Sequence, residues 1–211
     1  MCAFDTSLIF YTNPQSRGRV VHWMLEEVGC AYETRWLEYG TTMKDAEYLS
    51  INPAGKVPAI RHGDAVVTET VAICTYLADV FPEAGLVPDA EDREAKAAYY
   101  RWLFFVAGPL EAAVANKILN VKVSDDMKRA IGHGGIDEVV AILESLIKGK
   151  DYIAGNRFTT ADLVLCSYIG FYMSFDVLPK TTEFERYVKL HTSRPAFLKV
   201  MAMNENSSAA S

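Results

Sequence analysis

The chain has 211 residues, of which 50% are hydrophobic and 23% are charged. This composition is typical of a folded protein with a substantial core, and it excludes disordered and fibrous architectures. The 21 basic and 27 acidic residues give a formal net charge of −6, so the chain lacks the cationic surplus that binds phosphate backbones or anionic lipid. We therefore expect no nucleic-acid partner.

Compartment and metal content are indicated by what the sequence lacks. The longest nearly uncharged apolar stretch, between Asp162 and Asp176, has about a dozen residues, short of the roughly 20 that a membrane-spanning helix needs. The N-terminal residues do not resemble a signal peptide. The four cysteines, at positions 2, 30, 74 and 166, are far apart and have no histidine at zinc-ligand spacing. These features predict a cytoplasmic protein with no membrane contact, no disulfide framework and no metal site.

Residues 1–81 alternate extended and helical patterns, which is typical of a sheet covered by helices. The expected elements are a strand at 7–11, a helix from residue 16 or 17 to 28, a strand at 32–36, a helical or irregular segment to residue 50, a hairpin of strands at 57–61 and 65–68, and a helix at 70–81. Gly29 follows the first helix where a left-handed capping residue is expected.

A second domain is predicted to be entirely helical. Residues 82–88, rich in Pro and Gly, indicate a linker, residues 89–203 the helical domain, and residues 204–211 a frayed tail. We expect a long helix capped by Asp89 and kinked at Pro109, a helix over 124–147 weakened by glycines, and a helix from Thr159 with Asp162 completing a capping box.

Three short segments converge on one end of the first domain: the turn at 12–19, the run Asn-Pro-Ala-Gly-Lys-Val-Pro at 52–58, and Thr-Glu-Thr at 68–70. Their order and spacing resemble the glutathione-binding domain of the cytosolic glutathione transferases. The likeness continues in the second domain at 100–105, 159–162 and 194–197, so it covers nearly the whole chain, and it looks most like the bacterial transferases. It implies an α/β plus all-α protein: a thioredoxin-like N-terminal domain, βαβαββα, followed by a helical domain.

The resemblance also implies which residues bind glutathione. In that family a Val-Pro step with a cis peptide bond presents its backbone to the cysteinyl group, and Val57 and Pro58 match it. Glu69 and Thr70 match the acid and hydroxyl that hold the γ-glutamyl ammonium and carboxylate, and a helix N-terminus suits a carboxylate. Lys56 is placed to pair with the glycyl carboxylate. Without the resemblance, these segments indicate only a turn, a helix cap and a solvated lysine.

Catalysis in this family requires the glutathione thiolate. A thiol of pKa about 8.5 is mostly protonated at neutral pH, and lowering that pKa by one unit requires about 1.4 kcal/mol of preferential thiolate stabilisation. The resemblance implies a hydroxyl donor to this sulfur, and the favoured candidate is Ser16, which lies near the position of the catalytic serine in the serine type of the family. The alternative is Tyr11, which ends the first strand as the catalytic tyrosine does in the tyrosine type, and backbone amides near Arg17 or Gly18 are the third. The Arg17 side chain is a further binding candidate. No cysteine occupies this turn, which disfavours mixed-disulfide chemistry.

Aromatic and apolar residues of the helical domain are numerous enough to line a pocket for a hydrophobic acceptor, although such residues also form ordinary cores. The candidates are Tyr99, Trp102, Phe105, Val106, Tyr168 and Tyr172.

The leading hypothesis is a glutathione transferase that conjugates glutathione, as co-substrate, to hydrophobic electrophiles in detoxification. A glutathione-dependent peroxidase or disulfide oxidoreductase of the same fold, and a noncatalytic binding module, are the alternatives. The resemblance also implies a homodimer, and the long helix has apolar residues on a second face, at Tyr100, Leu103 and Phe104.

Overall fold

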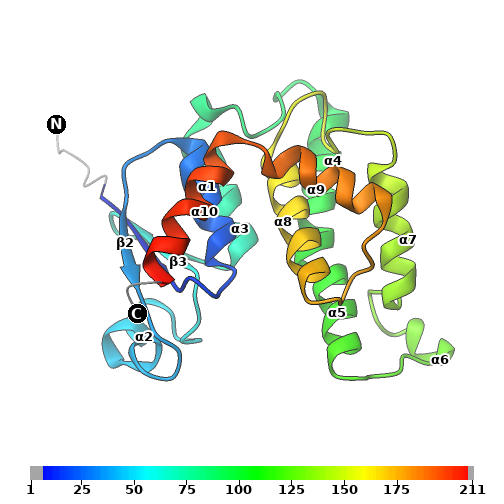
Figure 1. Cartoon of the computed structure of the whole chain (residues 1–211), viewed down its shortest axis with the longest axis horizontal. Helices are drawn as coiled ribbons and strands as arrows, with labels where there is room; N and C mark the ends of the chain where they lie inside the picture. The colour runs from blue at the N-terminus through cyan, green and yellow to red at the C-terminus, as the bar shows by residue number, and fades with distance from the viewer. Residues whose placement is uncertain (1–6, 209–211) are drawn as a thin grey trace. The chain divides into compact units, whose positions relative to one another are not determined.

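The computed structural model describes residues 7–208, which form two compact units (Figure 1). The first unit contains residues 7–84 together with 194–208, and the second contains residues 85–193. Among the described residues, no helix combines the length and the apolar character needed to cross a bilayer.

A four-stranded mixed sheet forms the centre of the first unit. Its strands are β1 (Leu8–Thr12), β2 (Glu33–Trp36), β3 (Ala59–His62) and β4 (Ala65–Thr68), in the order β2-β1-β3-β4. β1 pairs parallel with β2 and antiparallel with β3, and β3 and β4 form the predicted hairpin. β3 begins two residues later than expected, because Pro58 has no amide hydrogen to donate to a neighbouring strand.

Helices cover both faces of this sheet. The helices of the first unit are α1 (Gly18–Val28), the short 3-10 turn η1 (Thr42–Lys44), α2 (Ala46–Ile51), α3 (Thr70–Val80), the 3-10 turn η2 (Pro82–Ala84) and α10 (Pro195–Ser208). Phe10 contacts His22 of α1, whereas its neighbour Tyr11 packs with Tyr48 of α2. Since successive strand residues point to opposite faces, α1 and α2 lie on opposite sides of the sheet. The thioredoxin-like arrangement is confirmed.

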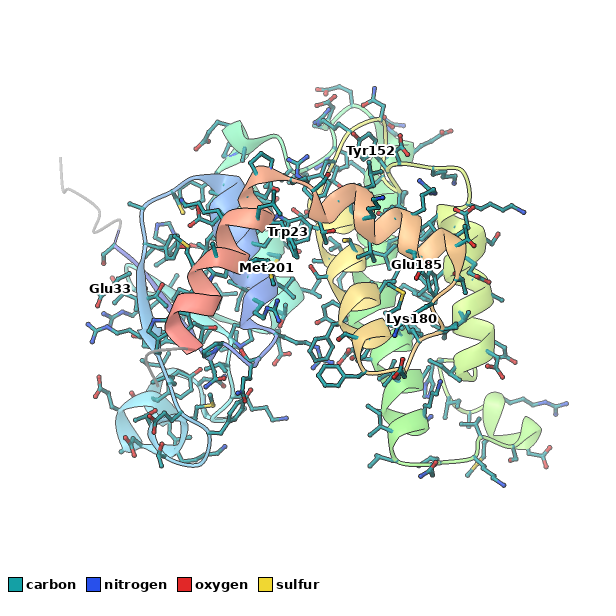
Figure 2. The ribbon with its side chains drawn as sticks, in the orientation of Figure 1. Trp23, Glu33, Tyr152, Lys180, Glu185 and Met201 are labelled. Carbon is teal, nitrogen blue, oxygen red and sulfur yellow. The ribbon has the colours of Figure 1, made fainter. Side chains whose placement is uncertain are left out.

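The predicted domain limits need correction at the C-terminal end, because α10 belongs to the first unit. Arg194 donates to both carboxylate oxygens of Glu27 on α1 at 2.7 Å, and Lys199 lies 2.5 Å from Glu26. The Phe197 ring packs edge-on against Trp23, 4.9 Å away. Figures 1 and 2 show α10 along α1. The helix continues to Ser208, where the sequence predicted a frayed tail, and residues 209–211 lie outside the described chain.

The second unit is helical, as predicted. Its helices are α4 (Arg93–Phe105), η3 (Val106–Leu110), α5 (Glu111–Ile118), α6 (Asp125–Lys128), α7 (Ile136–Ile147), α8 (Thr160–Ser174) and α9 (Thr182–Thr192). The expected helix over 124–147 is interrupted between α6 and α7, since each glycine in that gap costs about 1 kcal/mol in a helix.

The long helix differs from the prediction at its start and at its proline. Asp92, not Asp89, caps it by accepting a hydrogen bond from the Ala95 amide at 2.9 Å, and Asp89 instead pairs with Arg157 at 2.8 Å. At Pro109 the chain forms one π-helical turn, η3, because proline removes one backbone donor and displaces the preceding turn.

A fully buried carboxylate, Asp162, joins three segments of the second unit. It accepts hydrogen bonds at 2.8 Å from the amides of Ile153 and Thr159 and from the Tyr187 hydroxyl, and at 3.0 Å from the Thr159 hydroxyl. Burial raises the pKa of this carboxyl group, which the four donors oppose. The predicted reach of Asp162 back to Thr159 is confirmed.

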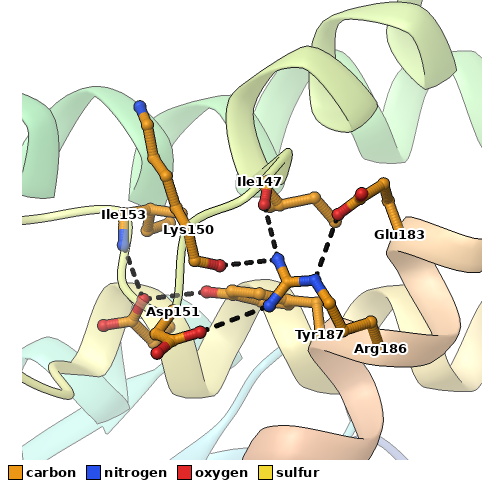
Figure 3. Close-up of polar contacts among 8 residues, drawn as sticks. Ile147, Lys150, Asp151, Ile153, Glu183, Arg186 and Tyr187 are labelled. Atoms are coloured by element: carbon orange, nitrogen blue, oxygen red, sulfur yellow. Dashed lines mark hydrogen bonds and ion pairs between the residues drawn. The ribbon is translucent and has the colours of Figure 1, made fainter.

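Beside this carboxylate, Arg186 ties α9 to the end of α7 (Figure 3). Its guanidinium donates to the carbonyl oxygens of Ile147 and Lys150, each at 2.6 Å, and pairs with Asp151 and Glu183 at 3.3 and 3.1 Å. One side chain therefore holds the last carbonyl of α7 and a carbonyl of the turn that follows it.

Candidate active site

Strand register brings the three predicted segments to one end of the sheet. Tyr11 pairs with Ala59, and Ala59 pairs with Thr68, so these residues form one row across β1, β3 and β4. β3 begins at this row, β4 ends there, and β1 ends one residue beyond it. The turn after β1, the Val57–Pro58 step and the start of α3 are therefore neighbours.

The turn at 13–17 is held by its own polar groups. The Asn13 side chain donates to the Leu37 carbonyl at 2.8 Å and accepts from the Gln15 amide at 2.9 Å. The Ser16 hydroxyl donates to the Asn13 carbonyl at 2.7 Å and accepts from the Gly18 amide at 2.9 Å. Ser16, 8% exposed, thus lies at the first amides of α1, as the sequence predicts, and its hydroxyl satisfies one of them.

Gly18 is required by the close approach of two hydroxyls. A Cβ at this position would collide with the Thr12 hydroxyl and lie 2.9 Å from the Ser16 hydroxyl oxygen. The residue after Arg17 must therefore lack a side chain for Ser16 to keep its place. Arg17 itself is half-buried in the turn.

Tyr11, the alternative donor, lies on the face of the sheet that α2 covers, opposite to α1. Its half-buried ring packs with the buried cluster of Met43, Tyr48 and Ala59, and its centroid is 5.6 Å from that of Tyr48. The structure thus separates the two candidates: Ser16 lies at the start of α1, and Tyr11 packs with α2.

The loop from Asn52 to Pro58 is held by three side chains that the sequence interpretation missed or treated as part of a turn. Tyr48 and Asn52 donate to the Lys56 carbonyl at 2.6 and 2.7 Å, and the ammonium group of Lys44 donates to the Gly55 carbonyl at 2.8 Å. Burial raises the pKa of Tyr48 to about 12.

The loop ends in the predicted cis peptide bond between Val57 and Pro58. Gly55 has φ +57°, and a Cβ there would lie 2.9 Å from the Met43 carbonyl, so glycine is needed at this position. The Lys56 side chain is exposed, as binding a free carboxylate would require. The sequence signal that could have found Tyr48 and Asn52 is their four-residue spacing at the end of α2, where Asn52 is the C-cap residue.

Glu69 and Thr70 form the start of α3, as predicted. Glu69 is exposed and has φ +71° and ψ 121°, a conformation that is unusual for a residue with a side chain and that concentrates at functional sites. In the described part of the chain, no side-chain hydrogen bond caps this helix, so its first amides remain available to an anion. A capping hydrogen bond therefore does not explain why a glutamate occupies position 69.

The predicted acceptor-pocket residues lie on α4, η3 and α8, and α4 packs against α8. Tyr99, Trp102, Val106, Tyr168 and Tyr172 are buried, whereas Phe105 is half-buried. The Tyr172 hydroxyl donates to the Glu111 carboxylate. These side chains contribute to the core of the second unit, and their role in binding an acceptor stays a prediction.

The described cysteines are poor sources of thiolate. Cys74 and Cys166 are buried core residues, and burial raises the pKa of both thiols. Burial also raises the pKa of the half-buried Cys30, and Cys2 lies outside the described residues. Within residues 7–208, no group of three or more His, Cys, Asp or Glu side chains is arranged to hold a metal ion.

Both parts of the chain match known domains. Residues 6–79 match the family model for the glutathione S-transferase N-terminal domain, and residues 112–195 match that for the C-terminal domain. Glutathione S-transferase Z2 of Arabidopsis thaliana is 31% identical over 72% of this chain and 71% of the relative. Glutathione S-transferase 1 of Dianthus caryophyllus is 32% identical over 63% of this chain, and the match spans 64% of that relative.

A solved structure extends the likeness to three dimensions. The glutathione transferase homologue from sulfitobacter, solved with bound glutathione, superposes with a TM-score of 0.76 over 94% of this chain and 98% of that one, at 25% identity. The fold, both domain matches and the relatives agree. The chain therefore belongs to the glutathione S-transferase family.

Proposed function

We propose that this protein binds glutathione at the end of the sheet, stabilises its thiolate and transfers the sulfur to a hydrophobic electrophile. The observation that carries the proposal is the meeting of the cis Val57–Pro58 step, the uncapped start of α3 and the Ser16 turn in one place. Family membership and the glutathione bound to a structural relative support it.

The reaction needs no protein nucleophile. The glutathione sulfur forms a bond to the electrophilic carbon, a leaving group such as halide departs with its bonding electrons, and the thiol proton passes to solvent. The protein contributes orientation and stabilisation of the sulfur anion.

Each residue at the sheet end then has a role matched to its chemistry. Glu69 pairs with the γ-glutamyl ammonium, while Thr70 and the first amides of α3 bind the neighbouring carboxylate. The Val57 backbone binds the cysteinyl group, and Lys56 pairs with the glycyl carboxylate. Arg17, half-buried beside Ser16, adds positive charge near an anionic tripeptide.

Ser16 is the proposed donor to the thiolate, in preference to Tyr11. It lies at the N-terminus of α1, where the helix dipole favours negative charge, and a serine hydroxyl can turn its hydrogen from the Asn13 carbonyl to a nearby anion. Tyr11 packs instead against the α2 cluster. The chain is thus proposed to be of the serine type.

Glu69→Gln is expected to weaken glutathione binding about tenfold in isothermal titration calorimetry, because the substitution removes a charge-assisted bond to the ligand ammonium. Glu83→Gln, an exposed glutamate on η2, is the matched control and binds like wild type. Equal dissociation constants for the two variants contradict the role given to Glu69. Absence of heat from wild type at millimolar glutathione favours the noncatalytic binder instead.

Burial raises the thiol pKa of Cys30, Cys74 and Cys166, and this disfavours disulfide chemistry at the cysteines that the structure describes. Faster turnover of hydroperoxide or disulfide substrates than of aryl halides favours the peroxidase or oxidoreductase alternative. Cys30, Cys74 and Cys166 are all free, and this supports a reducing compartment, the cytoplasm, as the proposed location.

The homodimer is proposed to use the exposed face of α4. Phe104 is 73% and Tyr100 is 45% exposed, and they lie one helical turn apart. Their neighbours Tyr99 and Leu103 are buried, so α4 presents apolar side chains to two sides. A second copy of the chain, covering this face by two-fold symmetry, is the proposed occupant.

Phe104→Glu is expected to convert the proposed dimer to a monomer in multi-angle light scattering, because an ionised carboxylate in an apolar interface loses its hydration without a partner. Phe175→Glu, at an exposed position after α8, is the control and keeps the wild-type mass. A wild-type monomer, or an unchanged dimer in Phe104→Glu, contradicts the assignment of this face.

A further inference from the structure

The loop before the cis bond is fixed by two buried donors that meet at one atom. Tyr48 and Asn52 both donate to the Lys56 carbonyl oxygen, at 2.6 and 2.7 Å, and are only 3% and 7% exposed. A backbone carbonyl has two acceptor lone pairs, so both are used. Loop carbonyls commonly accept hydrogen bonds from solvent. Two buried side-chain donors to one loop carbonyl are more than is needed to connect α2 to β3.

Both donors are themselves held in place by α2. Tyr48 and Asn52 are four residues apart, and the Asn52 amide donates to the Tyr48 carbonyl at 2.8 Å. The Asn52 side-chain oxygen accepts from the Ala54 amide at 3.1 Å, and the Gly55 amide donates to the Asn52 carbonyl at 2.8 Å. The end of α2 and the loop therefore form one connected polar network.

Fixing the Lys56 carbonyl also fixes the direction of the next amide. The peptide unit is planar, so the carbonyl of Lys56 and the N–H of Val57 lie in one plane and turn together. Pro58 has no N–H, and the Val57 amide is the last backbone donor before β3. The two hydrogen bonds to the Lys56 carbonyl therefore set where that donor points.

We propose that Tyr48 and Asn52 are positioning residues for glutathione, which orient the Val57 backbone by holding the Lys56 carbonyl. The inference rests on the proposed function, because the oriented amide is the one assigned to the cysteinyl group. Neither side chain touches the ligand in this scheme. Their contribution is to remove the conformational freedom of the loop before glutathione binds.

A loss of this orientation affects glutathione binding more than the chemical step. Tyr48→Phe keeps the ring beside Tyr11 and removes only the hydroxyl. We expect KM and the calorimetric Kd for glutathione to rise about tenfold, with kcat at saturating glutathione within about twofold of wild type. Asn52→Asp, which retains an acceptor for the Ala54 amide and loses the donor, is expected to show the same split.

The control is Tyr76→Phe, which removes a hydroxyl 3.0 Å from the His62 ring nitrogen, at the other end of β3 from Val57. It lowers stability without altering the loop, so its glutathione KM remains that of wild type. The inference is overturned if folded Tyr48→Phe has a wild-type KM, or if Tyr76→Phe raises KM equally. Should Tyr48→Phe not fold, Asn52→Asp decides by the same criteria. Failure of wild type to bind glutathione refutes the proposed function itself.

Discussion

Ser16→Ala is expected to lower kcat/KM for an aryl halide about tenfold or more, whereas Tyr11→Phe leaves it within about threefold of wild type. Tenfold corresponds to about 1.4 kcal/mol, the size of one charge-assisted hydrogen bond to the sulfur anion. Because the lost bond is to the thiolate, the pKa of bound glutathione rises by about one unit, and the pH–rate profile moves to higher pH by the same amount.

The Ser16 hydroxyl also accepts from the Gly18 amide, so its loss alters the start of α1 as well as the thiolate. Ser16→Gly separates the two effects, since glycine is tolerated at a helix start at a cost of only a few tenths of a kcal/mol. Equal rate losses in Ser16→Gly and Ser16→Ala identify the hydroxyl as the cause. If neither Ser16→Ala nor Tyr11→Phe slows turnover about tenfold, backbone amides near Arg17 become the remaining candidates.

Asp162→Ala is expected to lower the free energy of unfolding by about 3 kcal/mol or more. The substitution leaves two amides and the Tyr187 hydroxyl buried without their acceptor, and each such orphaned donor costs about 1–3 kcal/mol. The midpoint of urea denaturation, followed by far-ultraviolet circular dichroism, measures the loss.

Asp137→Ala is the matched control, because Asp137 is an exposed acidic residue in the first turn of α7. Its interaction with the helix dipole is worth less than about 1 kcal/mol. A similar loss of stability in both variants would mean that Asp162 contributes as an ordinary helix-terminal charge rather than through its buried hydrogen bonds.

Sequence patterns correctly predicted the elements whose formation depends on residues close together in the chain. The apolar face of α1 ends at Gly29, which has φ +73° and donates to the Leu25 carbonyl at 2.9 Å, as the sequence indicates. The hairpin of β3 and β4 follows from strand alternation around a tight turn. The sheet-end cluster was predictable because the resemblance supplied an order for three short motifs that are weak individually.

Long-range contacts explain what the sequence did not predict. Arg194 meets Glu27 across 167 positions of sequence, and neither residue alone indicates which unit α10 joins. Tyr48 looks like any helical aromatic residue until its hydroxyl is seen at the Lys56 carbonyl. Asp89 and Asp92 are both plausible caps by type, and the contact of Asp89 with Arg157 leaves Asp92 to cap α4.

The placement of α10 has a consequence for how the protein is made. Synthesis proceeds from the N-terminus, so the sheet and α1 emerge from the ribosome long before Arg194 and Lys199 exist to neutralise Glu26 and Glu27. During that interval the two acidic side chains and the Trp23 ring lack their final covering. The first unit thus begins to emerge before the second but completes its packing only after the second unit has been translated.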